Sequence, residues 1–223
     1  MKQIELKSPE VKNFDRDIMK ISHEIFQEEK LGIKTPVKFT FVFSPLEEEK
    51  DFDQVIRETA MNENHISFIL QVKSMMGNCS QIGENLLQKL KSLMDKIKDS
   101  KIADDLFKKN EGKYKKEYTK FDFMGYRKLL SDILKSKKVI DLESMGIDLK
   151  SVTASFHAFI LDRNKYTHGE LMFWVEKNAA LLEYENTDKE IEYGLVTKEI
   201  FQSFINCYEE LDKILELIWD EIK

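Results

Sequence analysis

The chain has 223 residues, of which 42% are hydrophobic and 34% are charged, which is enough apolar material to bury a sizeable core. The sequence has no run of about 18 apolar residues and no apolar leader, so we expect no membrane span, no membrane partner and a cytoplasmic location. Cys79 and Cys207 lack the spacing of a metal site, and we expect them to be reduced and buried.

A basic segment lies within a chain whose net charge is −6. Residues 101–138 contain 12 Lys and Arg against 6 Asp and Glu, whereas the rest of the chain contains 23 against 35. Such an asymmetry can guide a polyanion to one face of a protein. A lysine-rich solvated loop would have the same composition, so both interpretations stay open.

The first part of the chain predicts one helix and one strand. Ser8 and Pro9 form a helix start, and apolar residues at helical spacing continue to about Glu29. Alternating phenylalanines then predict a short strand at residues 39–43. We assign residues 1–60 to a helix and strand extension whose role the sequence does not reveal.

The centre of the chain predicts helices. One helical pattern covers residues 51–98 with a break at Gly77-Asn78, and a second covers residues 123–134. The lysine-rich residues 108–120 between them predict a loop. Residues 142–147 predict a connection with Gly146.

Asp148 is a suitable N-cap for the next helix, which we expect to end near Gly169 in a left-handed conformation. Its predicted buried side comprises Val152, Phe156, Phe159 and Ile160.

The periodicity then changes to that of strands. Residues 171–176, 179–185 and 190–196 predict strands, with a turn at 186–189. Thr197 is expected to cap a final helix with an apolar stripe. The sequence thus predicts a single mainly α domain over residues 1–223. Its helical core, residues 61–223, carries a small antiparallel β insertion at about 171–196 before the C-terminal helix. The predicted stripe of that helix runs through Phe204, Cys207, Tyr208, Leu211, Ile214, Leu215, Ile218 and Trp219.

Arg163, Asn164 and His168 form a motif at the predicted end of the residue 148–169 helix. Arginine is scarce, with four residues in the chain, so its presence here is informative. Asn164 and His168 are four residues apart and share a helix face, while the long Arg163 side chain can reach over the helix end. A histidine in this place can act as an acid or base near neutral pH. These three groups can hold and cleave a phosphodiester without a metal or cofactor.

At these residues the chain resembles the HEPN superfamily, helical domains of prokaryotic toxins and antiviral systems. That family is marked by Arg, four to six intervening residues and His. Here the spacer is four, Asn164 follows Arg163, and Gly169 follows His168. The resemblance covers about residues 148–169 and implies an up-and-down helical bundle. Some toxin members have a tyrosine two residues after the histidine, where this chain has Glu170.

The resemblance implies a metal-independent endoribonuclease of a toxin–antitoxin or antiviral defence system, in which the 2′-hydroxyl of RNA attacks the phosphate. It implies a homodimer that joins two motifs in one cleft, and an antitoxin or defence protein as a possible partner. Arg163 would hold the phosphate, His168 would transfer a proton and Asn164 would orient a reacting group. The expected RNA-binding residues are Lys165, Lys113, Lys115 and Lys116.

Three other interpretations remain open. The chain could be a non-catalytic HEPN-type module that dimerises or binds a partner protein or nucleotide. Arg163 could pair with Asp162 or Glu170, and His168 could merely cap the helix. A metal-dependent nuclease would require clustered carboxylates near the motif.

Overall fold

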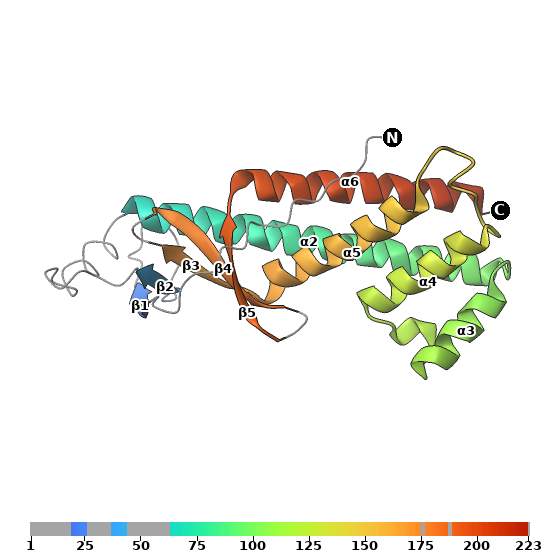
Figure 1. The fold of residues 1–223 in the computed structure, drawn as a ribbon, viewed down its shortest axis with the longest axis horizontal. Helices are drawn as coiled ribbons and strands as arrows, with labels where there is room; N and C mark the ends of the chain where they lie inside the picture. The colour runs from blue at the N-terminus through green and yellow to red at the C-terminus, as the bar shows by residue number, and fades with distance from the viewer. Residues whose placement is uncertain (1–18, 26–36, 44–62, 175–176, 187–188, 223) are drawn as a thin grey trace, which may run out of the picture. The chain divides into compact units, whose positions relative to one another are not determined.

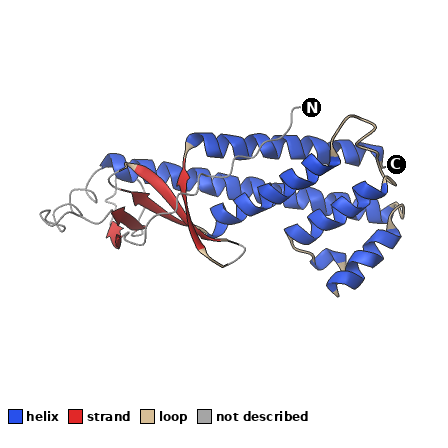
Figure 2. Ribbon diagram, viewed as in Figure 1, coloured by secondary structure: helices blue, strands red, loops and turns tan. Residues whose placement is uncertain are grey.

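The structure is a computed structural model that describes residues 19–25, 37–43, 63–174, 177–186 and 189–222. It is mainly helical, with antiparallel strands before the C-terminal helix, which confirms the predicted fold class (Figures 1 and 2). The helices are α2 (Glu63–Asp99), α3 (Asp104–Tyr114), α4 (Phe123–Ser136), α5 (Leu149–His168) and α6 (Lys198–Glu221), and the strands are β1 (Met19–Ile25), β2 (Val37–Phe43), β3 (Glu170–Trp174), β4 (Ala179–Glu185) and β5 (Ile191–Val196).

The described residues divide into two compact units. One, called here the helical unit, comprises residues 79–164 and 201–222. The other, called the sheet unit, comprises the described residues of 8–78 and 165–200. No helix of the described part of the chain is long and apolar enough to cross a membrane.

The core of the helical unit forms where α5 packs against α6. The rings of Phe159 and Phe204 stack with centroids 4.4 Å apart and planes 13° apart, and Phe123 from α4 meets Phe159 edge-on at 6.4 Å. Stacked and edge-on pairs of this kind add to the stabilisation from burying the rings. All four residues predicted to line the buried side of α5 are indeed buried.

The apolar stripe of α6 is confirmed over most of its length. Six of its eight predicted members are buried, but Tyr208 is only partly covered and Trp219 is 40% exposed. Both cysteines are free and buried, as predicted. Burial raises the pKa of the Cys79 thiol to about 12 and that of Cys207 to about 12, the latter helped by the negative charge of the nearby Asp162.

The predicted helix caps are present. Asp148 Oδ2 accepts hydrogen bonds from the backbone N–H (3.1 Å) and hydroxyl (2.7 Å) of Ser151, which lowers the pKa of the Asp148 carboxyl. Thr197 Oγ1 accepts a hydrogen bond of 3.4 Å from the backbone N–H of Ile200 at the start of α6. In the predicted connection before α5, Gly146 has a φ of 75°, a conformation that glycine adopts without strain.

Two helix predictions in the centre of the chain were wrong. Helix α2 continues through Gly77 and Asn78 without a break, and Gly77 is exposed there with no atom near its missing side chain. Residues 108–120 were predicted as a loop, but residues 108–114 belong to α3 and a short 3-10 helix follows at Tyr118–Lys120.

Helix α3 forms because its packing outweighs its lysines. Phe107 is completely buried, and the Asn110 side chain, 1% exposed, donates to Leu106 O and to Asp132 Oδ2 on α4. These contacts offset the loss of helix stability caused by Gly112, which is about 1 kcal/mol for a glycine inside a helix.

The sheet unit contains a five-stranded sheet of order β1-β2-β3-β4-β5. Strands β3, β4 and β5 pair antiparallel as predicted, and β4 has the predicted bounds. Strand β2, also predicted, pairs in parallel with β3, and the Thr40 hydroxyl donates a 2.7 Å hydrogen bond to Glu170. The predicted helix to Glu29 was wrong over Met19–Ile25, which forms β1; its other residues lie outside the described chain.

Gly169 ends α5 for a reason different from the predicted one. Its backbone is not left-handed, and its N–H still donates to Lys165 O at 2.8 Å. A Cβ at this position would lie 2.5 Å from Lys165 O, 2.7 Å from Leu182 Cδ1 and 3.0 Å from Glu183 O. The glycine is therefore required because the last turn of α5 and the adjacent strand β4 together leave no room for a Cβ between α5 and β3.

We predict that Gly169→Ala lowers the free energy of unfolding by roughly 2 kcal/mol, because the new methyl group overlaps Lys165 O of α5 and the Leu182 side chain of β4. Gly77→Ala is the matched control, since this exposed position in the same unit has space for a methyl group. It should stabilise the protein by about 0.5 to 1 kcal/mol. Urea unfolding measures the stability of both variants. Equal stabilities would show that residue 169 has space for a side chain.

Candidate functional site

Arg163 and Asn164 lie in the last two turns of α5, within the helical unit. The Arg163 side chain is only 18% exposed, and its Nη2 forms an ion pair with Glu84 of α2. Its Nη1 donates a 3.1 Å hydrogen bond to Asn164 Oδ1, while Asn164 itself is exposed. The first two residues of the motif are thus in direct contact, and a carboxylate from a second helix joins them.

Gly83 allows Arg163 to occupy this position. A Cβ on Gly83 would overlap Cγ of Arg163 and lie 3.4 Å from its Cβ. The arginine stem therefore crosses α2 over a residue without a side chain, and the next residue, Glu84, forms an ion pair with the guanidinium. Burial lowers the pKa of Arg163 from its usual range. The guanidinium nevertheless remains a cation at neutral pH, because the ordinary pKa of arginine lies far above 7.

His168 and Lys165 belong to the sheet unit. His168 is the last residue of α5 and is exposed, as is Thr167 before it. Tyr166 is buried and anchors this last turn, and Lys165 Nζ lies 4.9 Å from the centroid of the Tyr184 ring on β4. The last turn of α5 therefore has a fixed aromatic anchor on one side and an accessible imidazole on the other.

The other predicted RNA-binding residues lie in the helical unit but apart from the motif. Lys113, Lys115 and Lys116 are exposed at the C-terminal end of α3, where Lys115 adopts a left-handed conformation (φ 52°). Figure 1 shows α3 beside α4, away from the end of α5 that carries Arg163. The lysines therefore do not contact Arg163; they lie on a separate part of the unit.

The predicted structural partners of Arg163 were Asp162 and Glu170. Asp162 is buried, at 4% exposure, and Glu170 accepts the hydrogen bond from Thr40. Arg163 forms an ion pair with Glu84, a partner that sequence reasoning missed. The glycine next to it, Gly83, was the one sequence signal for a close approach of another helix at this point. The sequence does not show that the other helix is α5.

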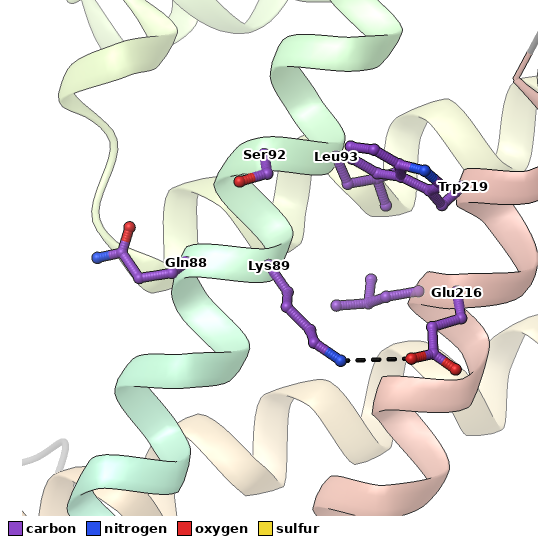
Figure 3. A pocket seen from close by; sticks show the side chains of 7 residues that line it. Gln88, Lys89, Ser92, Leu93, Glu216 and Trp219 are labelled. Atoms are coloured by element: carbon purple, nitrogen blue, oxygen red, sulfur yellow. Dashed lines mark hydrogen bonds and ion pairs between the residues drawn. The ribbon is translucent and has the colours of Figure 1, made fainter.

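A pocket of about 420 Å³ lies between α2 and α6 in the helical unit. Leu93, Leu215 and Trp219 form its apolar wall, and Figure 3 shows Lys89 reaching across to Glu216, 3.4 Å away. No residue of the motif lines it. Among the described residues, no three His, Cys, Asp or Glu side chains are grouped so that they could hold a metal ion.

Comparison with known proteins gives no match: no family model fits the sequence, and neither the curated proteins nor the solved structures contain a significant relative.

We predict that Gly83→Ala moves the Arg163 side chain, because the new methyl group would overlap its Cγ. The Nε–Hε resonance of Arg163, assigned with Arg163→Lys, should shift, and the protein should lose about 1 kcal/mol of stability. Gly112→Ala on α3 is the control, since nothing lies near that position. It should leave the resonance in place. An unchanged Arg163 resonance in Gly83→Ala would show that the helices do not approach closely there.

Proposed function

We propose that this protein is a metal-independent endoribonuclease of the HEPN type, acting in a toxin–antitoxin or antiviral defence system. The observation that carries the proposal is the contact between Arg163 and Asn164, 3.1 Å apart, one turn before an exposed histidine. A fixed guanidinium beside an exposed amide suits recognition of a phosphate. An exposed imidazole on the following turn of the helix suits proton transfer.

The proposed reaction is an internal transfer of the phosphate. His168 accepts the proton of the 2′-hydroxyl, the 2′-oxygen bonds to phosphorus, and the bond from phosphorus to the 5′-oxygen breaks. The 5′-oxygen takes a proton from water and leaves as a hydroxyl group, a 2′,3′-cyclic phosphate remains, and the protonated His168 returns its proton to solvent. Arg163 stabilises the negative charge that develops on the phosphate oxygens, and Asn164 orients the reacting group.

Glu84 has a place in this scheme as an orienting residue. It holds the guanidinium of Arg163 from the α2 side, so the arginine does not have to be ordered when RNA binds. We propose that two chains associate so that two motifs share one cleft, and that Lys165 and the lysines at the end of α3 contribute to RNA binding.

The second candidate is a non-catalytic module that binds a partner protein or a nucleotide. The pairing of Arg163 with Glu84 favours it, because the charge of the guanidinium is already balanced inside the protein. In that case the motif would stabilise α5 and no cleavage would occur.

We predict that the purified protein cleaves single-stranded RNA in the presence of EDTA and leaves 2′,3′-cyclic phosphate ends. His168→Ala should lower the cleavage rate by about 100-fold or more, and Asn164→Ala should lower it as well. Asn206→Ala, an exposed asparagine on α6, is the control and should cleave like the wild type. Gel analysis of end-labelled RNA measures the rate. Equal rates for the wild type and His168→Ala would favour the binding module.

We predict that the lysines at the end of α3 contribute to the salt dependence of RNA binding. Replacing Lys113, Lys115 and Lys116 by Gln should reduce the slope of log affinity against log salt by up to about 2, because about 0.7 counterions are released per phosphate contact. Anisotropy with labelled RNA at several salt concentrations measures this slope. The matched control replaces Lys137, Lys138 and Lys213, which are in ion pairs, and should leave the slope nearly unchanged.

A further inference from the structure

A second group of cationic side chains lies in the helical unit, where α4 meets α5. Arg127 and Lys128 come from α4 and His157 from α5, and Tyr114 of α3 completes the group. We call these four residues the Arg127 cluster. Arg127 Nη1 donates to Thr153 O of α5 at 3.4 Å, and Thr153 is one turn before His157 on the same helix face. Lys128 Nζ lies 5.9 Å from the centroid of the Tyr114 ring.

The cluster has no carboxylate to balance it. Among the described residues, neither Arg127 nor Lys128 forms an ion pair with an acid. Arg163 differs in this respect, because its guanidinium forms an ion pair with Glu84. Partial desolvation lowers the pKa of His157, and the like charges of Arg127 and Lys128 lower it further. Arg127 and Lys128 therefore disfavour the protonated form of His157 in the absence of an anion.

Two polar atoms of the cluster are buried without a partner. Nε of Arg127 and the hydroxyl of Tyr114 each have no hydrogen-bond acceptor or donor among the described residues. A buried polar group left unpaired is costly, and more so when it is charged. An oxyanion bound beside the cluster would balance its positive charge and accept a hydrogen bond from Arg127.

The cluster also has a defined relation to the motif. His157 is seven residues before Asn164, which is two turns of helix, so both lie on one face of α5 about 10 Å apart along its axis. On its other side the cluster borders the end of α3, where Lys113 Nζ lies 5.7 Å from the centroid of the same Tyr114 ring. It therefore lies between the lysines of α3 and the arginine of the motif.

We propose that Arg127, Lys128 and His157 form a phosphate-binding site for single-stranded RNA, at a phosphate other than the one that Arg163 holds. Arg127 provides hydrogen bonds and Lys128 provides charge, while His157 takes up a proton when the phosphate offsets their charges. The inference takes RNA as the ligand from the proposed function, but it does not require that the RNA is cleaved.

The test is the affinity for a short single-stranded RNA whose 2′-hydroxyls are methylated, so that it cannot be cleaved. Arg127→Gln should weaken binding by roughly tenfold, because a charge-assisted hydrogen bond is lost. The double variant Lys128→Gln/His157→Gln, both of whose positions are exposed, should also weaken binding, and it keeps the test valid if Arg127→Gln unfolds. The control Lys138→Gln/Lys213→Gln removes two paired lysines and should bind like the wild type.

A second arm uses inorganic phosphate and the ring-proton resonances of His157. Phosphate should raise the pKa of His157 in the wild type, because an anion offsets Arg127 and Lys128, and should raise it less in Arg127→Gln. A structural role for Arg127 would not produce this difference. Wild-type affinity for the RNA in both variants would overturn the proposal, as would a response to inorganic phosphate with no loss of RNA binding.

The proposal and the proposed function fail in different ways. If His168→Ala leaves cleavage unchanged while Arg127→Gln weakens binding of the methylated RNA, the phosphate site stands and the catalytic role of the motif falls. If cleavage depends on His168 while both cluster variants bind RNA normally, the reverse holds.

Discussion

The close approach of α2 and α5 at Gly83 is the constraint on which the position of Arg163 depends. Only a hydrogen fits where the stem of Arg163 crosses α2. A glycine in the interior of a helix costs about 1 kcal/mol relative to alanine, and α2 bears that cost in the middle of a 37-residue helix. Glu84 then follows directly and holds the guanidinium. The position of the arginine is therefore determined from α2 as much as from α5.

The elements with regular periodicity and clear caps could be predicted from the sequence. Helix α5 and its buried side, the start of α6 at Thr197 and the strand Ala179–Glu185 all follow from local patterns, because each depends on residues close in sequence. Helix α3 could not be predicted, since its lysines indicate a loop while Phe107 and Asn110 stabilise it through contacts with other elements. The pairing of β2 with β3 joins residues about 130 positions apart, and no local pattern encodes such a pairing.

The candidate site was predictable only in the part that lies along one helix. Arg163, Asn164 and His168 are close in sequence, and helix geometry alone relates them. Glu84 was not predictable, because its role depends on where α2 crosses α5. The same holds for Arg127 and His157, which belong to different helices and share a site only through the packing of α4 on α5. Gly169 illustrates the converse: its place at the helix end was predicted, but the reason is the lack of space for a side chain between Lys165 O and strand β4.

The two buried cysteines have a practical consequence. A thiol reacts with alkylating reagents as the thiolate, and a pKa of about 12 leaves almost none of that form near neutral pH. Cys79 and Cys207 therefore become reactive only when the helices around them separate. Because Cys207 is close enough to Asp162 to sense its charge, its alkylation rate reports how often the segment just before Arg163 opens. The alkylation rate of the native Cys207 thus measures local opening beside the motif, and no cysteine has to be introduced for the measurement.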